Sequence, residues 1–343
     1  MGGIMTGKEI ASLAFELKPV PRVPVTIIGG GAWAVHRAGK TFARIKNDPG
    51  QIADAFTRYA RQFRLDLLWM GSNFINYPIH FLGCDLKDDS ADSPALEGSV
   101  IKSLDELESL SIEKVLKNPT MQAIIKAHHW VADAIGKETL VIPTNWAPFT
   151  FAARILGVEN TMMATISEPD RLTRLIRFAT DLIWAVSEQV LAHENILGVN
   201  FSDPVASGDL ISPPTFRSFS APALKDLVER TRARGKYAMI HICGNTGKVL
   251  EDVLKIAPHC FSLENKVPLK TAKEILGGKV CVAGNVSPTG AFLNGKPEEV
   301  LAEARACLEA WGNDPGYILT VGCDFAKNVP LENMTALMSF KKD

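Results

Sequence analysis

The sequence has no excess of charge of either sign. Its 343 residues include 37 basic and 38 acidic side chains, and the pI is about 6.7. Phosphate backbones are bound through clustered positive charge, so this balance argues against a nucleic-acid partner. The sequence also lacks an apolar run of the roughly 18 residues that a membrane span needs, and no charged segment followed by an apolar core opens it. We therefore expect a cytoplasmic protein without a membrane partner.

Cysteine is scarce as well, with six residues in the chain. Without a secretory signal, so few thiols do not indicate a disulfide framework, and reduced cysteines pack in the core or bind metal. We interpret Cys260, Cys281 and Cys307 as packing residues, because the first two fall within or at the start of predicted strands and the third in the middle of a predicted helix. The remaining three are Cys84, Cys243 and Cys323.

Short apolar runs ending in Gly, Asn, Asp or Pro alternate along the chain with amphipathic stretches. The runs are typical of buried strands and the stretches of surface helices. This alternation predicts an α/β fold, a (β/α)8 TIM barrel, with residues 1–343 in a single domain. We expect residues 1–22 to form an N-terminal extension and residues 80–120, rich in Asp, Ser, Glu and Lys, to form an excursion between the second and third strands. The expected strands are 23–31, 65–73, 139–148, 196–204, 238–244, 260–266, 279–288 and 317–324.

Polar residues of uncommon type occur where the predicted strands end. In a (β/α)8 barrel these ends converge on one mouth, where the active site lies. The alternation of side chains along a strand places His241 and Cys243 on the same side, facing inward together. One imidazole, two thiolates and one carboxylate are a plausible zinc shell, for which the sequence offers His241, Cys243, Glu264 and Cys323. The full set of residues at strand ends is Asn145, Asp203, His241, Cys243, Glu264, Asn285 and Cys323.

A His-x-Cys pair by itself is weak evidence for metal, because free cysteine is among the most buried residue types. The joint placement of His241 and Cys243 with Glu264 and Cys323, at the ends of three strands, favours a metal site over packing. Two thiolates and a carboxylate give the zinc shell a net negative charge. Such a shell suits coordination of a substrate heteroatom better than formation of hydroxide.

Three segments carry a resemblance to a known family. They are "NFSDPVASGDLISPPTF" (200–216), "HICGNTGKVLEDVLKIAPHCFSLENK" (241–266) and "VGCDFAKNVPLENMTALM" (321–338). Together they resemble the zinc-dependent methyltransferases of the uroporphyrinogen decarboxylase superfamily. That group includes methylcobamide:coenzyme M methyltransferases and the methyltransferase components of bacterial O-demethylases. The resemblance is specific over about 196 to 340 and loose before that.

The resemblance implies a uroporphyrinogen decarboxylase-like barrel that transfers methyl groups in one-carbon metabolism. Its cofactors would be zinc, on His241, Cys243 and Cys323, and a corrinoid (cobalamin) presented by a partner corrinoid-binding protein. The placement of Glu264 is similar to that in the zinc site of cobalamin-independent methionine synthase, which implies a displaceable fourth ligand with a catalytic role. A homodimer stays an open alternative.

The methyl donor or acceptor is less well determined by the sequence. Trp33, Trp69, Trp146 and Phe149 lie at or beyond the ends of the first three predicted strands, where they could hold an aromatic ring. The small anionic thiol coenzyme M would call for a cation, for which only two basic residues near that rim are candidates. We therefore expect O-demethylation of an aryl methyl ether, with methylation of a thiol as the alternative. The two basic candidates are Arg37 and Lys40.

Asn145, Asp203 and Asn285 are expected to position substrate, and Asp203 could also deliver a proton to the leaving oxygen. Alternatively, Asp203 or Asn285 could cap a helix that follows its strand.

Two further alternatives differ in class. A porphyrinogen decarboxylase is disfavoured, because the N-terminal segment of true uroporphyrinogen decarboxylases is rich in arginine and residues 25–42 offer only Arg37. A non-catalytic module that binds zinc structurally or docks a corrinoid protein is the other.

Four histidines are expected at the surface, since they fall in or beside predicted helices and loops. They are His128, His129, His193 and His259.

Overall fold

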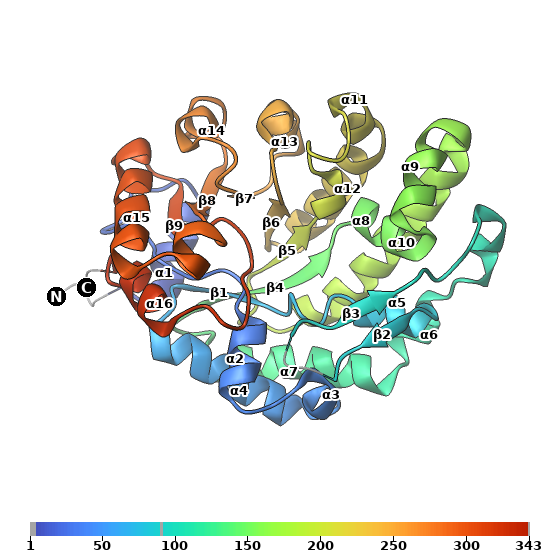
Figure 1. The fold of residues 1–343 in the computed structure, drawn as a ribbon, viewed down its shortest axis with the longest axis horizontal. Helices are drawn as coiled ribbons and strands as arrows, with labels where there is room; N and C mark the ends of the chain where they lie inside the picture. Colours follow the sequence, from blue (N-terminus) through green and yellow to red (C-terminus); the bar gives the residue numbers. More distant parts are fainter. Residues whose placement is uncertain (1–4, 90–91, 342–343) are drawn as a thin grey trace.

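The computed structural model describes residues 5–89 and 92–341. Its main element is a parallel sheet with the strand order β1-β4-β5-β6-β7-β8-β9. Figure 1 shows this sheet in the middle of the molecule with helices around it, so the predicted barrel architecture is confirmed. The strands are β1 (Leu67–Met70), β4 (Leu140–Trp146), β5 (Gly198–Ser202), β6 (Tyr237–Ile242), β7 (Cys260–Leu263), β8 (Cys281–Val286) and β9 (Tyr317–Val321).

The first expected strand, 23–31, fills its place between β9 and β1 without becoming a regular strand. Val25 makes one parallel bridge to Leu319 of β9, and the Thr26 hydroxyl donates to the Leu67 carbonyl of β1. The proline before Val25 has no N–H to donate to a ladder. The glycines that follow turn the chain into a helix instead. Seven of the eight predicted strands are therefore regular strands, and the remaining one, 23–31, is reduced to a single bridge.

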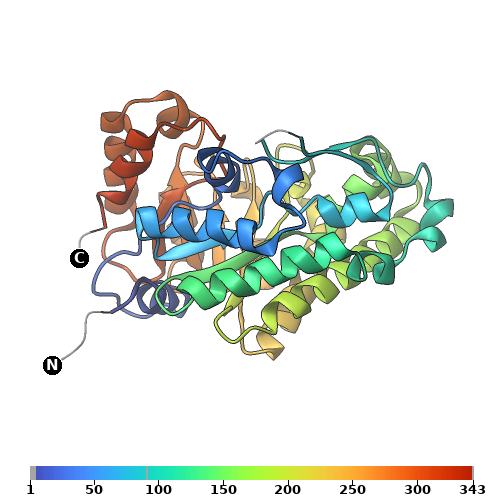
Figure 2. The same cartoon turned by 90° about the horizontal axis from the view of Figure 1, so that it is seen from below.

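Helices begin where the sequence supplies caps and prolines. The carboxylate of Asp48 accepts from the N–H groups of Gly50 and Gln51, and Pro49 occupies the first helical position of α4. Figure 2 shows α4 beside α7, which begins in the same way at Pro119. The helices are α1 (Gly7–Phe15), α2 (Gly31–Arg37), α3 (Phe42–Ile45), α4 (Pro49–Phe63), α5 (Tyr77–Leu82), α6 (Ile112–Leu116), α7 (Pro119–Ile135), α8 (Pro148–Leu156), α9 (Val158–Ser167), α10 (Pro169–Leu191), α11 (Pro213–Thr215), α12 (Ala221–Ala233), α13 (Leu250–Ile256), α14 (Leu269–Leu276), α15 (Pro297–Trp311) and α16 (Leu331–Met338).

Residues 80–120 leave the alternation of strands and helices. They contain a small antiparallel pair, β2 (Asp85–Lys87) and β3 (Ala95–Glu97), together with α6. Between the two strands, Asp92 forms an ion pair of 2.7 Å with Lys327, which follows β9. This contact ties the excursion to the loop that leaves the last strand of the barrel.

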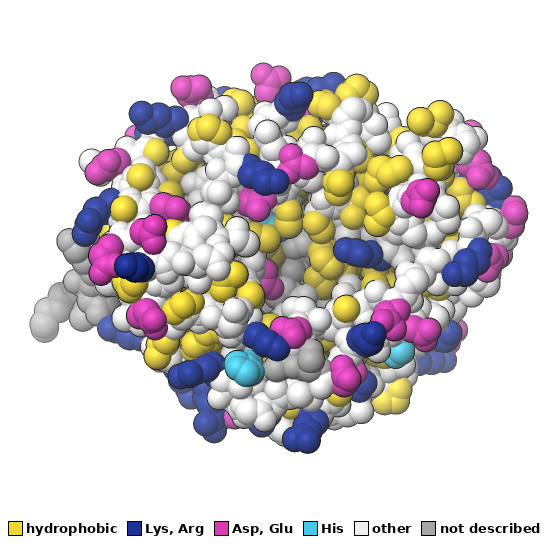
Figure 3. All heavy atoms as spheres, in the orientation of Figure 1, with side chains coloured by type: hydrophobic (Ala, Val, Ile, Leu, Met, Phe, Trp, Pro, Cys, Tyr) yellow, Lys and Arg dark blue, Asp and Glu magenta, His cyan; other side chains and the backbone are white. Residues whose placement is uncertain are grey.

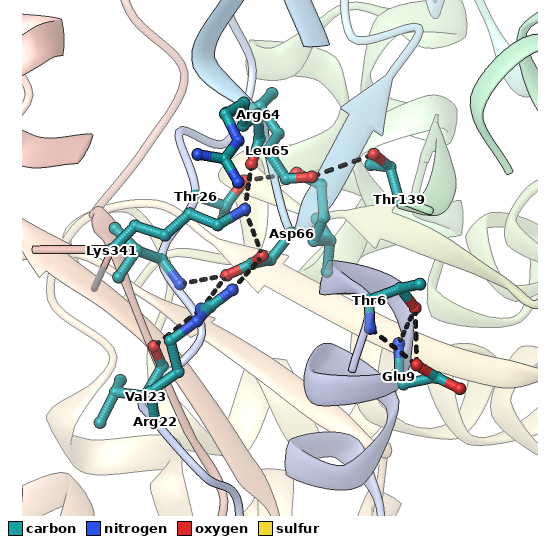
Figure 4. Close-up of polar contacts among 12 residues, drawn as sticks. Thr6, Glu9, Arg22, Val23, Thr26, Arg64, Leu65, Asp66, Thr139 and Lys341 are labelled. Atoms are coloured by element: carbon teal, nitrogen blue, oxygen red, sulfur yellow. Dashed lines mark hydrogen bonds and ion pairs between the residues drawn. The ribbon is translucent and has the colours of Figure 1, made fainter. Parts of the chain in front are cut away.

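A buried carboxylate joins both ends of the chain to β1. Asp66 accepts hydrogen bonds from both terminal nitrogens of Arg22, at 2.6 and 2.9 Å, and from the Val25 N–H at 2.9 Å. Lys341 forms an ion pair with it at 2.8 Å (Figure 4). Burial alone would raise the pKa of Asp66, but these donors hold the pKa below its ordinary value. The cluster therefore fixes the start of β1 against the N- and C-terminal segments.

In the described part of the chain, no helix combines the length and the apolar character that a membrane crossing requires.

Candidate metal centre and active site

Three candidate metal ligands converge at the ends of two strands. His241 lies in β6, Cys243 directly follows it, and Cys323 follows β9. The His241 Nε2 atom lies 3.1 Å from the Cys243 sulfur and 3.5 Å from the Cys323 sulfur, and the two sulfurs are 3.6 Å apart. All three ligand atoms fall within 4.8 Å of one another. The predicted inward placement of His241 and Cys243 on one side is therefore what the structure shows.

The other ring nitrogen of His241 is held by the neighbouring strand. The His241 Nδ1 atom lies 3.0 Å from the Ser262 hydroxyl of β7, and the register pairs these two residues. The indole of Trp69, from β1, packs edge-on against the imidazole with the ring centres 5.2 Å apart. These contacts leave the Nε2 atom directed at the sulfurs, which is the usual arrangement of a metal-ligating histidine.

The chemistry of this ligand set fits zinc. A tetrahedral site with zinc bonds of about 2.0–2.3 Å has neighbouring ligand atoms about 3.3–3.8 Å apart, close to the separations here. Contact with Cys243 and burial raise the pKa of Cys323 well above its ordinary value. A bound divalent cation would favour the thiolate forms of both cysteines. One imidazole and two thiols therefore suit zinc better than a hard cation.

Glu264, the predicted fourth ligand, lies beside this cluster and not in it. It follows β7, is half-buried, and one carboxylate oxygen accepts from the Gly244 N–H, next to Cys243 in sequence. Asn285 was expected to position substrate, and in the structure its side-chain amide donates to the carbonyls of Glu264 and Val267 at 3.4 and 2.9 Å. Asn285 instead supports the loop that carries Glu264.

A cavity of about 330 Å³ contains the cluster at its wall. Figure 3 shows that the face presented in Figure 1 is hollowed near its middle, with hydrophobic side chains gathered beside the hollow. Two residues of the excursion, Ser93 and Pro94, form part of the cavity wall, so the excursion contributes directly to the site. The lining residues are Trp69, Ser72, Ile75, Asn76, Ser93, Pro94, Trp146, Arg154, Ser202, Pro204, His241, Cys243, Cys323 and Asp324.

Two of the four aromatic residues expected around the substrate line this cavity. Trp69 does so, and Trp146 does so with its indole N–H donating to Asn76 at 2.7 Å. Trp33 does not line this cavity, because the chain turns into α2 before it. The buried Trp33 indole packs against α4 and donates to the Val329 carbonyl at 3.0 Å. Phe149 is also buried elsewhere, stacked on Phe219.

Asn145 and Asp203 were both expected to position substrate, and neither lines the cavity. Asn145 precedes Trp146 in β4 and therefore points to the other face of the strand, where its amide donates to the Ser187 hydroxyl of α10 at 3.0 Å. Asp203 is fully buried, and its two oxygens accept from Thr150 and Ser220. The bond from the Thr150 N–H makes Asp203 a cap of α8, which is not the helix after its own strand.

The sequence matches the family described as "Uroporphyrinogen decarboxylase (URO-D)" over residues 6–343. The chain belongs to the uroporphyrinogen decarboxylase family. Within the family it is similar to a methylated-thiol:coenzyme M methyltransferase of Methanosarcina mazei, with 28% identity over 78% of this chain and 70% of that protein. A methylcobamide:CoM methyltransferase of Methanosarcina barkeri is 27% identical over 67% of this chain and 66% of its own length.

The fold is shared with a solved "methyltransferase from Methanosarcina mazei". The TM-score is 0.88 at 23% identity, and the match covers 98% of both chains. These findings confirm the predicted resemblance to the methyltransferases of the uroporphyrinogen decarboxylase family.

The basic residue that lines the cavity is not one of the two candidates from the sequence. Arg37 and Lys40 lie in a separate recess with Trp33, over whose ring the Arg37 guanidinium sits at 5.4 Å. Arg154 is the arginine that lines the cavity beside His241, Cys243 and Cys323, and we did not predict it. Its signal in the sequence is a single charge within the otherwise apolar stretch "PFTFAARIL" of α8.

Asp324 is a second residue that the motifs did not reveal. It follows Cys323 and accepts from the Gly30 N–H at 2.7 Å and from the Ser72 hydroxyl at 2.7 Å. A Cβ at Gly29, where φ is +78°, would collide with the Asp324 carboxylate, so glycine is required there. Asp324 thus joins the glycine turn and the loop after β1 to the loop that carries a ligand.

His128 lies in the core, which corrects its expected surface position. Burial lowers the pKa of His128 to about 4, while an unfolded chain keeps about 6.5. The unfolded state therefore binds a proton that the native state does not. The contribution of His128 to the free energy of unfolding should be complete above pH 6.5 and fall by about 3 kcal/mol as the pH drops to 4.

Urea unfolding at a series of pH values measures this effect. The His128→Leu variant should lose this part of the pH dependence, whereas His36→Leu, at an exposed histidine, should keep it. An unchanged slope between pH 6.5 and 4 in His128→Leu would contradict the prediction.

Proposed function

We propose that this protein is an enzyme that transfers a methyl group between a small molecule bound at the metal cluster and the cobalt of a corrinoid carried by a partner protein. The observation that carries the proposal is the convergence of His241, Cys243 and Cys323 within 4.8 Å at the wall of a cavity. The names of the relatives, which are methyltransferases acting on coenzyme M, support the same reaction type.

The cluster residues would hold zinc, with Glu264 as the proposed displaceable fourth ligand. Bound zinc would act as a Lewis acid toward a substrate heteroatom. The chain's own residues orient this site: Ser262 fixes the His241 ring, and Asp324 fixes the loop after Cys323. The excursion covers part of the cavity with Ser93 and Pro94 and so reduces the access of water.

We propose an aryl methyl ether as the methyl donor. Trp69 and Trp146 line the cavity, and offset or edge-on contacts between aromatic rings favour such a ligand. In this reaction the C–O bond breaks, the oxygen keeps the electron pair and takes up a proton, and the methyl group passes to reduced cobalt. A phenoxide is a good leaving group, because the pKa of its conjugate acid is about 10, like that of tyrosine.

A thiol acceptor is the second candidate function. Both named relatives act on coenzyme M, and the cavity holds an arginine that the sequence-based prediction placed elsewhere. A porphyrinogen decarboxylase finds less support. Several propionates would need several cations, and Arg154 is the one arginine or lysine among the residues that line this cavity.

The test is methyl transfer observed through the visible spectrum of the corrinoid. Zinc-loaded protein is given cob(I)alamin, and methylcobalamin formation is followed on addition of guaiacol, veratrole or vanillate. Formation that requires Cys243 supports the demethylating function. Loss of the methyl group from methylcobalamin on addition of coenzyme M, without demethylation, supports the thiol function instead. If no methyl transfer is seen in either direction, the proposed enzymatic function is contradicted, and a non-catalytic module that binds zinc or docks a corrinoid protein is favoured.

A further inference from the structure

Helix α8 is buried along its length except at one position. The eight other residues between Pro148 and Leu156 are buried, and Arg154 is exposed. Its side chain lines the cavity of the metal cluster. The fold therefore brings one cation to the solvent side of this cavity from a helix that otherwise only packs.

Arg154 has no ion pair or hydrogen bond among residues 5–89 and 92–341. Other polar side chains of the wall are engaged with one another: Asn76 accepts from Trp146 and donates to the Pro94 carbonyl at 2.8 Å. The carboxylate of Asp324 accepts from the Ser72 hydroxyl and from two backbone N–H groups. No anion of the cavity wall, within the same ranges, neutralises the guanidinium.

A second hydrogen-bond donor of the cavity is also without an acceptor in the described structure. The Trp69 indole nitrogen is buried and unsatisfied, and the Trp69 ring packs against His241. A buried donor without a partner is unfavourable, so such a group is usually satisfied by a ligand or water. The two unengaged groups are both donors, one near the metal cluster and one at the solvent side.

We infer that Arg154 binds an anionic group of the substrate, a carboxylate or a sulfonate, at the solvent side of the cavity. The inference rests on the proposed function for the reaction that this substrate undergoes. The planar guanidinium presents paired N–H groups to two oxygens of one anion. A cavity of about 330 Å³ holds a small molecule, such as a methoxybenzoate or a short sulfonated thiol.

Isothermal titration calorimetry with the zinc-loaded full chain tests the inference without turnover. The first pair of ligands is 3-methoxybenzoate and its neutral counterpart 3-methoxybenzamide. The second pair is 2-mercaptoethanesulfonate and 2-mercaptoethanol. Wild type should bind the anion of at least one pair about 10- to 100-fold more tightly than its neutral counterpart, because a hydrogen-bonded pair of opposite charges increases affinity by about this factor. The pair that shows the preference identifies carboxylate or sulfonate as the group recognised.

Variants assign the preference to one side chain. Arg154→Gln should abolish it, Arg154→Lys should keep part of it, and Arg37→Gln, at an exposed arginine in a different recess, should keep all of it. In turnover, Arg154→Gln should raise KM for the anionic substrate and leave kcat nearly unchanged. Equal binding of both members of both pairs by the wild type, or an unchanged preference in Arg154→Gln, overturns the inference.

The inference and the proposed function can fail separately. A protein that binds anions through Arg154 but transfers no methyl group overturns the proposed function alone. A protein that transfers methyl groups while Arg154→Gln retains the full anion preference overturns this inference alone.

Discussion

Replacing Cys243 by alanine is expected to remove bound zinc and methyl transfer together. The Cys243 sulfur lies 3.1 Å from the His241 Nε2 atom and 3.6 Å from the Cys323 sulfur, so its loss leaves two of the three clustered ligands. Zinc affinity should fall by more than the roughly 10- to 100-fold that accompanies loss of an outer hydrogen-bond partner. Zinc content after dialysis against a weak chelator, together with the initial rate of transfer, measures both effects.

Two control variants show how large the effect of Cys243→Ala on zinc binding is. Ser262→Ala removes the hydroxyl next to the His241 Nδ1 atom and should weaken zinc binding by about 10- to 100-fold without abolishing it. Cys260→Ala removes a buried thiol of β7 that is outside the cluster, and it should keep full zinc content. Retention of zinc by Cys243→Ala would show that the three residues are not a metal site.

The convergence of His241, Cys243 and Cys323 was predictable because it depends on local rules. Cys243 directly follows β6, two residues after His241, so the extended backbone places both side chains on the same side. The carboxyl ends of the barrel strands also lie at one end of the barrel, which brings Cys323 close to them. The same rule fails for Asn145 and Trp146, because consecutive residues face opposite ways and the pattern does not say which one faces the cavity. In the structure it is Trp146 that lines the cavity.

The barrel was predictable for a similar reason, since buried runs and amphipathic stretches alternate through most of the chain. The exception is the first expected strand, whose sequence contains Pro24 and the three glycines that end at Gly31. These residues limit it to the bridge at Val25, where neighbouring strands still hold it in place.

Residues that act through distant partners could not be predicted. Asp203 lies at a strand end like His241 and Cys243, but its partner Thr150 is 53 positions away. Arg154 looks in the sequence like any surface charge, since long charged side chains are mostly exposed. Only the packing of α8 shows that its single exposed residue lines the cavity.

Replacing Asp203 by alanine is expected to lower the free energy of unfolding by about 2–4 kcal/mol. The Asp203 carboxylate accepts from the Thr150 N–H at 2.8 Å, the Thr150 hydroxyl at 2.6 Å and the Ser220 hydroxyl at 2.6 Å. Alanine would leave these buried donors without an acceptor and α8 without its cap. Urea unfolding monitored by circular dichroism measures the loss.

Asparagine at position 203 separates this structural role from catalysis. Its amide oxygen can still accept from Thr150, and the Ser220 hydroxyl can rotate to accept from the amide nitrogen, so Asp203→Asn should cost far less stability than alanine. Burial raises the pKa of Asp203 above its ordinary value despite the three donors. A raised native pKa means that this carboxyl contributes most to stability at low pH and loses that contribution as the pH rises through the native pKa. The stability of Asp203→Asn relative to wild type should therefore improve from pH 4 to 8.

The activity of Asp203→Asn tests the catalytic role. Because the side chain does not reach the cavity, methyl transfer by this variant should stay within a few-fold of wild type. A loss of 100-fold or more, with stability retained, would assign Asp203 to proton transfer instead.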